Sequence, residues 1–316
     1  MNTPRHFLFV AAVVLTALLI PTSCNTESRS QHAAKSKKTG VLLVNHGSHS
    51  PTWRQALLDL ETAVKDSLLN TGLIQGTRTA YMEYTEPSIA TQLKAFDAEG
   101  YTDVIIVPIF LTVSSHSFDD IPTIIGQKED PQSLETLKIE KIERYTPKAQ
   151  IHITPLLDFT DVLKKNILRR AKALSKNPSE EGLVLIAYGD ETYMKEWTNL
   201  MHAVGSYVKE NAGIDAYSYG WCGHVARYNP DSTTVAINRV LKLKKQALVI
   251  PVLVAHDEMF QVKIIGDGIN KTGKNKARIS YIPDSILPDP VVEHWVINIA
   301  TEFAHKIQQN EVALAQ

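Results

Sequence analysis

Residues 40–44 read GVLLV, a short apolar run, and a similar run, GLVLI, occupies residues 182–186. Apolar runs of this length are typical of strands that are buried on both faces of a sheet. After the first run, apolar side chains recur at helical spacing across residues 53–68. Because a helix that joins two neighbouring strands makes those strands parallel, this alternation predicts an α/β fold built on parallel sheets.

The second half of the chain repeats the order of the first. Three further pairs of segments match: residues 103–109 with 246–252, residues 124–126 with 264–266, and residues 151–155 with 279–283. The repeat predicts two similar domains related by internal duplication, each with a parallel four-stranded sheet flanked by helices. We place the first domain at residues 40–157 and the second, with a connecting helix, at residues 158–316. A cleft between two such domains is a common place for a ligand.

The N-terminal segment has the pattern of an export signal. Arg5 and His6 precede an apolar run at residues 7–20, which is shorter than the ~20 residues needed to span a bilayer. We therefore predict a signal peptide at residues 1–23, with an uncleaved membrane anchor as the alternative. Cys24 follows small residues and resembles the lipidated cysteine of bacterial lipoproteins, and residues 24–39 read as a polar linker. These features predict an exported lipoprotein, anchored to a membrane in the periplasm or cell envelope.

Composition narrows the class of protein. The 316 residues include 33 basic and 34 acidic side chains, so the formal net charge is −1 and the basic excess of nucleic-acid-binding proteins is absent from the sequence. With 44% hydrophobic residues, the chain can bury a substantial core. Its cysteines, Cys24 and Cys222, are too few for a disulfide framework or a four-thiolate zinc site.

Three chemically distinctive side chains follow the predicted strands of the first half. His46 comes after the first strand, Glu83 near the end of the second, predicted at residues 78–84, and His116 after the third. Neighbouring strands lie ~4.8 Å apart, so side chains at their carboxyl ends can converge. Two imidazoles and one carboxylate suit Co²⁺, Fe²⁺, Ni²⁺ or Zn²⁺ better than Mg²⁺ or Ca²⁺. The alternative is that these are structural side chains, since the chain has 11 histidines.

The segments around these residues carry a family resemblance. They read NHGS at residues 45–48, YMEYTEPS at residues 81–88 and SSHSFDDIP at residues 114–122. Together they resemble the class II chelatases of tetrapyrrole biosynthesis, particularly the sirohydrochlorin cobaltochelatases and ferrochelatases. The resemblance is strong over residues 40–126 and reaches the second half only through the repeat.

The resemblance implies two chelatase-like domains and an ATP-independent enzyme. Its reaction would be the insertion of Co²⁺, or of Fe²⁺ or Ni²⁺, into sirohydrochlorin or a related tetrapyrrole, in cobalamin or sirohaem metabolism. By this resemblance His46 is the proton acceptor and a metal ligand, His116 is the second ligand, and Glu83 is a ligand or a substrate-positioning carboxylate. Glu86 is the alternative to Glu83. No cofactor is expected beyond the substrate metal.

The same resemblance assigns the macrocycle edge to a short loop in the first half. This loop consists of Leu111, Thr112, Val113, Ser114 and Ser115. In the second half, Cys222, His224 and His256 either form another metal site or belong to a degenerate copy that only shapes the cleft. Because one chain supplies both halves, we expect a functional monomer.

Two other functions remain open from the sequence. The leader points outward, whereas tetrapyrrole synthesis is normally cytoplasmic, so the protein could be an exported lipoprotein that binds a metal, haem or a corrinoid without turnover. Removal of a metal from a captured tetrapyrrole would use the same ligands in reverse.

Overall fold

The computed structural model describes residues 1, 37–157 and 161–314. The predicted signal peptide and Cys24 lie outside the described residues, as does most of the predicted linker. Residues from Lys37 onward form one compact unit, and the following description concerns that unit. Within the described part of the chain, no helix combines the length and the apolarity that crossing a membrane requires.

Each half contains a four-stranded parallel sheet, which confirms the predicted fold class. The first sheet has the order β2-β1-β3-β4, and the second has the equivalent order β6-β5-β7-β8. The strands are β1 (Thr39–Asn45), β2 (Gly76–Tyr81), β3 (Asp103–Pro108), β4 (Gln150–Ile153), β5 (Glu181–Ala187), β6 (Ala216–Trp221), β7 (Gln246–Val252) and β8 (Ile279–Tyr281).

Helices connect the strands, and local sequence signals define several of their ends. Ser50 caps the first helix by accepting a hydrogen bond from Trp53 N, and Ser88 caps the second in the same way. The α-helices are α1 (Pro51–Leu69), α2 (Ile89–Ala98), α3 (Ile121–Ile124), α4 (Pro131–Ile139), α5 (Val162–Leu174), α6 (Met194–Ala212), α7 (Asp231–Leu241), α8 (Gly266–Asn270) and α9 (Pro290–Leu314). Shorter turns are the π-helical η1 (His116–Asp120) and η5 (Met259–Ile265) and the 3₁₀ turns η3 (Pro178–Glu180), η4 (His224–Ala226) and η6 (Gly273–Arg278).

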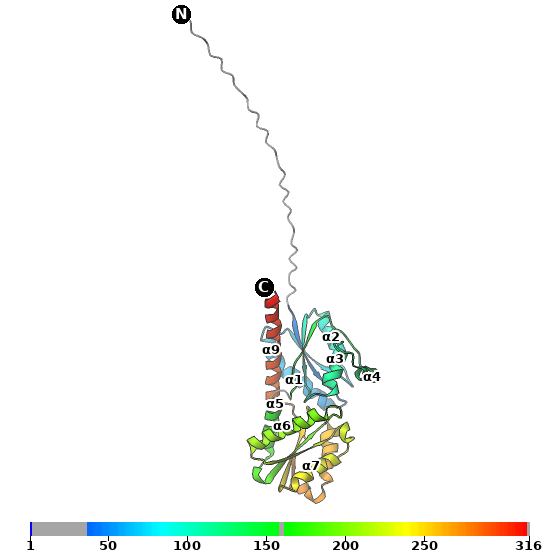
Figure 1. The fold of residues 1–316 in the computed structure, drawn as a ribbon, viewed down its shortest axis with the longest axis vertical. Coiled ribbons are helices and arrows are strands. Elements are labelled where there is room, and N and C mark those ends of the chain that lie inside the picture. Colours follow the sequence, from blue (N-terminus) through cyan, green and yellow to red (C-terminus); the bar gives the residue numbers. More distant parts are fainter. Residues whose placement is uncertain (2–36, 158–160, 315–316) are drawn as a thin grey trace. The chain divides into compact units, whose positions relative to one another are not determined.

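The helices form layers on both faces of each sheet (Figure 1). Helices α2, α3 and α4 cover one face of the first sheet, and α7 and α8 cover the corresponding face of the second. The other two faces share one large core, to which α1, α5, α6 and α9 contribute. A single core of this kind fixes the two halves against each other.

Helices α5 and α9 are exchanged between the halves. Helix α5 follows the first sheet along the chain but packs against α6 and β7 of the second half. Helix α9 follows the second sheet but packs against α1 and β3 of the first. Buried Asp289, just before α9, accepts hydrogen bonds from Asn166 and Arg169 of α5, which ties the two crossing segments together. Helix α9 therefore covers the first sheet, although its residues lie in the range predicted as the second domain.

Candidate metal centre

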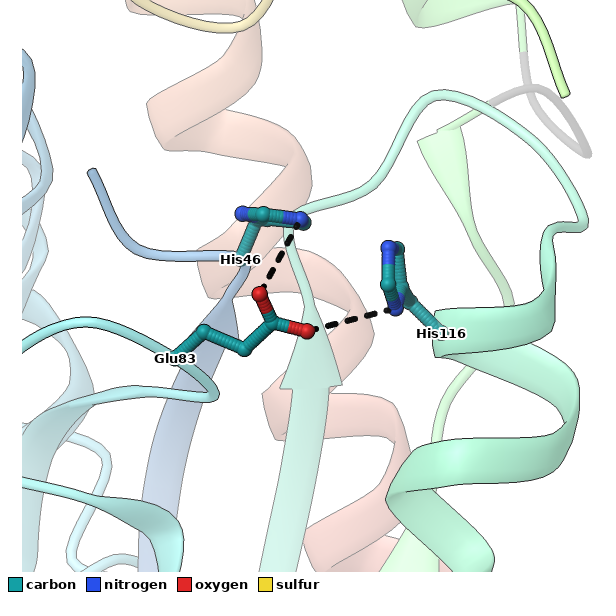
Figure 2. Close-up of side chains that lie close together, drawn as sticks. All are labelled: His46, Glu83 and His116. Carbon is teal, nitrogen blue, oxygen red and sulfur yellow. Dashed lines mark ion pairs between the residues drawn. The ribbon is translucent and has the colours of Figure 1, made fainter. Parts of the chain in front are cut away.

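His46, Glu83 and His116 converge at the carboxyl edge of the first sheet (Figure 2). One ligand atom from each lies within 4.8 Å of those from the other two. Glu83 Oε2 is 4.0 Å from His46 Nε2, and Glu83 Oε1 is 3.8 Å from His116 Nδ1. Figure 2 shows the carboxylate facing both imidazoles. Two nitrogens and one carboxylate at this spacing form a donor set that suits a first-row divalent ion.

Backbone pairing beyond the strands holds His46 next to Glu83. Met82 N donates to Asn45 O at 2.9 Å, and Glu83 N donates to His46 O at 2.9 Å. Gly47 permits this approach: its φ is +96°, and a Cβ at this position would lie 2.2 Å from the Glu83 carbonyl oxygen. Only glycine adopts such a φ without strain. The His-Gly pair after β1 is therefore a steric requirement of the centre.

Glu83, rather than Glu86, belongs to the cluster. Strand β2 runs from Gly76 to Tyr81, so the predicted strand at residues 78–84 ends three residues too late and Glu83 lies in the following turn. Its side chain is buried, at 7% exposure. Glu86 is exposed, and its Oε2 accepts a hydrogen bond of 2.6 Å from Ser88 N at the start of α2.

Each histidine ring is oriented through Nδ1. His116 opens the π-helical turn η1, and its Nδ1 lies 2.8 Å from Asp120 Oδ2 at the end of that turn. His46 Nδ1 lies 3.0 Å from Gly47 O. Because carboxylate and carbonyl oxygens only accept, both Nδ1 atoms carry a proton, and in the neutral ring Nε2 is the nitrogen that keeps a lone pair. Sequence reasoning did not include Asp120 in the candidate site; its spacing of four residues after His116 was the available signal.

The surroundings shift the pKa values of the two histidines in opposite directions. Burial, followed by the proximity of protonated His116, lowers the pKa of His46 below that of a free imidazole. Burial also opposes protonation of His116, but the hydrogen bond to Asp120 and the negative charge of Glu83 outweigh it and raise the pKa of His116. At neutral pH His46 is therefore the neutral imidazole, with a lone pair for a metal or a proton.

The centre opens into a cleft of about 610 Å³ that both halves line. His46 and His116 are part of its wall, whereas Glu83 lies behind them, outside the set of lining residues. Within the loop predicted to contact the macrocycle, Leu111, Thr112 and Ser114 line the cleft.

Two residues of that loop point elsewhere. Val113 packs against the core that α2, α3 and α4 cover. Ser115 N and Oγ each lie 3.4 Å from Asp190 Oδ2 of the second half. The structure therefore places three of the five loop residues at the cleft wall.

Hydrogen bonds between the halves fix the width of the cleft. Ser48 Oγ, two residues after His46, donates to Asp257 Oδ2 at 2.7 Å. Tyr193 OH donates to Asp119 Oδ2, beside Asp120, at 2.8 Å. Both pairs join residues more than 70 positions apart, which is why one sequence carried no signal for them.

The second half has lost the metal ligands at the equivalent positions. Gly223 N donates to Tyr188 O at 3.0 Å, as Glu83 N does to His46 O, so Tyr188 replaces the histidine and Gly223 replaces the glutamate. A Cβ on Gly223 would lie 2.7 Å from the Tyr188 ring. The tyrosine ring therefore fills the space next to the backbone where the first half has its carboxylate.

Cys222, His224 and His256 are not brought together. Cys222 occupies the position of Met82, is fully buried in the core under α7, and has its thiol pKa raised by burial. His256 Nδ1 donates to Pro283 O at 2.8 Å, next to a separate pocket with Arg169 and Arg170. Among the described residues, the one cluster with metal-ligand geometry is that of His46, Glu83 and His116. The second half is thus a degenerate copy that shapes the cleft.

Comparison with known proteins identifies relatives of the first half of the chain. The CbiX family model matches residues 40–174. A sirohydrochlorin cobaltochelatase from Methanococcoides burtonii is 32% identical over 104 residues, which are 32% of this chain and 72% of that protein. The sirohydrochlorin cobaltochelatase from Methanocaldococcus jannaschii is 33% identical over 90 residues, which are 28% of this chain and 60% of that protein.

Solved structures of low identity share the fold of both halves. The sirohydrochlorin chelatase SirB from Bacillus subtilis subspecies spizizenii, in complex with cobalt, has a TM-score of 0.60 at 17% identity, covering 86% of this chain and 97% of that one. The CbiX described as the terminal enzyme for biosynthesis of siroheme in denitrifying bacteria has a TM-score of 0.55 at 15% identity, covering 83% and 98%.

The duplicated α/β fold, with its metal-ligand cluster at the edge of one sheet, defines a chelatase-type protein. The sequence matches are more specific, and by them the chain belongs to the CbiX family of sirohydrochlorin chelatases.

Proposed function

We propose that this protein is an ATP-independent chelatase that inserts a divalent metal ion into sirohydrochlorin or a related tetrapyrrole, with Co²⁺ as the first candidate and Fe²⁺ as the second. The observation that carries the proposal is the His46–Glu83–His116 cluster at the wall of a cleft large enough for a planar macrocycle. Relatives named as cobaltochelatases, and a related fold solved with cobalt, support the same reaction.

The ligands of the metal also serve as proton acceptors. Insertion moves the ion from protein atoms to the macrocycle nitrogens, and both pyrrole N–H groups lose their protons. When the ion leaves His46 Nε2, that nitrogen regains a lone pair beside the macrocycle and can take a proton. The lowered pKa of His46 keeps it neutral before this step. The Glu83 carboxylate, behind both rings, can accept the other proton.

His116 has a complementary role. Its Nδ1–H is held by Asp120, which fixes the orientation of the ring and leaves Nε2 as the nitrogen with a lone pair. The raised pKa of His116 makes its imidazole the more basic of the two, and the hydrogen bond to Asp120 fixes the orientation of the ring. In this proposal His116 positions the metal, and His46, which stays neutral at lower pH, takes the pyrrole proton.

Absorption spectroscopy tests the reaction. Purified protein is mixed with sirohydrochlorin and Co²⁺, and the spectral change is followed over many equivalents of macrocycle. We expect multiple turnovers for the wild type, loss of most activity for His46→Ala, and wild-type rates for the control His305→Ala, an exposed histidine on α9. Equal rates for the wild type and His46→Ala would refute the catalytic role. Uptake that stops at one equivalent would favour the binding lipoprotein.

We also propose that the enzyme acts outside the cytoplasm, anchored through a lipid on Cys24. The support for this is the signal-peptide pattern at residues 1–23, followed by Cys24. In cell fractionation, the wild-type protein should remain with membranes and Cys24→Ala should not carry the lipid. Finding the wild type in the cytosol without lipid would exclude this location.

A further inference from the structure

Aromatic side chains of the second half form one wall of the cleft. We define the aromatic wall as Tyr188, Tyr228 and Phe260, all of which line the cleft. The rings of Tyr188 and Phe260 are 5.5 Å apart, those of Tyr228 and Phe260 are 6.3 Å apart, and the two tyrosine hydroxyls are 3.1 Å apart. Tyr188 stands where the first half has His46. The lost metal site has therefore been replaced by a surface suited to stacking.

Large apolar side chains in the cleft remain exposed to water. Tyr84 is 51% exposed, Tyr228 is 45% exposed and Met259 is 44% exposed, and all three line the cleft. Tyr84 belongs to the first half, where its ring lies 5.7 Å from that of His46. Exposed apolar side chains gathered in one concave site indicate a ligand with an apolar surface. A flat macrocycle seated next to His46 would cover them.

The same cleft offers little to a ligand with many negative charges. Among its described lining residues, the permanent charges are those of Asp257, Glu258 and Lys263, two acidic groups against one basic group. Arg54 is the nearest basic residue on α1, but it lies outside the lining and donates to Ser48 O at 2.7 Å. Carboxylates that enter this cleft would lose their hydrating water, and Lys263 is the one permanently cationic side chain among the described lining residues. Burying several carboxylates there is therefore unfavourable.

Building on the proposed chelatase function, we propose that the preferred macrocycle is a planar tetrapyrrole with few carboxylate side chains. Its ring stacks on the aromatic wall, its apolar edge enters the cleft, and its carboxylates point to solvent. Sirohydrochlorin, which carries carboxylates around its whole rim, is by this inference the poorer ligand.

A series of porphyrins with one ring system and increasing numbers of carboxylates tests the preference. Protoporphyrin, coproporphyrin and uroporphyrin are titrated into the full-length protein without metal, and binding is read from quenching of porphyrin fluorescence. We expect the Kd to rise along the series by at least about tenfold. A Kd for uroporphyrin equal to or lower than that for protoporphyrin would overturn the inference.

Two substitutions distinguish specific binding of the porphyrin in the cleft from non-specific adsorption to the protein. Phe260→Ala should weaken protoporphyrin binding about tenfold while leaving Co²⁺ titration without macrocycle unchanged. Glu258→Lys, at an exposed lining residue, should tighten uroporphyrin binding several-fold and leave protoporphyrin unaffected. The control Glu210→Lys makes the same charge change on α6, outside the cleft lining. If both lysine variants bind uroporphyrin alike, the charge of the cleft does not select the macrocycle.

The outcomes distinguish this inference from the proposed function. If sirohydrochlorin binds as tightly as protoporphyrin and receives Co²⁺ efficiently, the substrate class is wrong and the chelatase function stands. If no macrocycle of either kind is bound or metallated, the chelatase function itself fails.

Discussion

Asp120 Oδ2 lies 2.8 Å from His116 Nδ1, and the two residues open and close the same π-helical turn. The widened turn places a carboxylate next to an imidazole of the candidate metal cluster. Carboxylates in this position fix the tautomer of the ring and strengthen its other nitrogen as a ligand.

Removing that carboxylate should weaken metal binding without removing a ligand. We expect Asp120→Ala to reduce Co²⁺ affinity by roughly 10–100-fold. Asp120→Asn, whose amide oxygen can still accept from Nδ1, should lose less. Isothermal titration with Co²⁺ measures both. Identical losses for the two variants would mean that Asp120 does not act through this hydrogen bond.

Metal binding should also fail at a higher pH than a free imidazole predicts. A protonated His116 cannot bind a metal, and its pKa is raised by Asp120 and Glu83. Affinity is therefore present above the raised pKa and is lost as the pH falls through it. In Asp120→Asn the pKa falls, so the loss should move to lower pH. Co²⁺ titrations across a pH series would show this shift, and an unchanged midpoint would contradict it.

The choice between the two glutamates can be tested directly. Glu83→Gln removes a carboxylate facing both histidines, so we expect Co²⁺ affinity to fall by at least about tenfold with the fold retained. Glu86→Gln changes an exposed carboxylate that binds Ser88 N and should leave affinity unchanged. The reverse result would move the ligand from Glu83 to Glu86.

Gly47 should be intolerant of any side chain. In Gly47→Ala, both a positive φ and a contact of 2.2 Å with the Glu83 carbonyl oppose the new Cβ, so we expect a loss of about 1–3 kcal/mol in stability together with weaker Co²⁺ binding. Gly72→Ala is the control, because Gly72 also has a positive φ, +71°, but a Cβ at that position would have no atom within 4 Å. Thermal unfolding of both variants separates the strain from the clash. Equal destabilisation would show that the contact with Glu83 is unimportant.

Cys222 should have no part in metal binding. Its thiol is fully buried at the position equivalent to Met82, and burial raises its pKa. Cys222→Ala should therefore bind Co²⁺ with wild-type affinity and stoichiometry and lose about 1 kcal/mol of stability through lost packing. A drop in metal stoichiometry would reinstate the thiol as a ligand.

The sequence was sufficient for the sheets and for the members of the metal cluster, because both depend on local pattern. Apolar runs predicted the parallel strands, and strand order brought His46, Glu83 and His116 to one edge. The roles assigned to those three residues stay predictions until the variants are measured.

Features that depend on distant partners were out of reach. The bond between Ser48 and Asp257 joins positions 209 residues apart, and neither residue type is unusual on a protein surface. Helix α9 has one apolar face, but an amphipathic pattern does not say which sheet that face will cover. The true end of β2 was missed because residues 82 and 83 continue backbone pairing beyond the strand.

The exchange of α5 and α9 has a consequence for how the duplicated gene could change. Without the second half, α1 and β3 would lose the helix that covers them. The half that lacks the metal-ligand cluster is therefore part of the interior of the half that has it. The second half keeps this packing role without holding a metal-ligand cluster. Its residues at the cleft surface, Tyr188 among them, could therefore vary without disturbing the core.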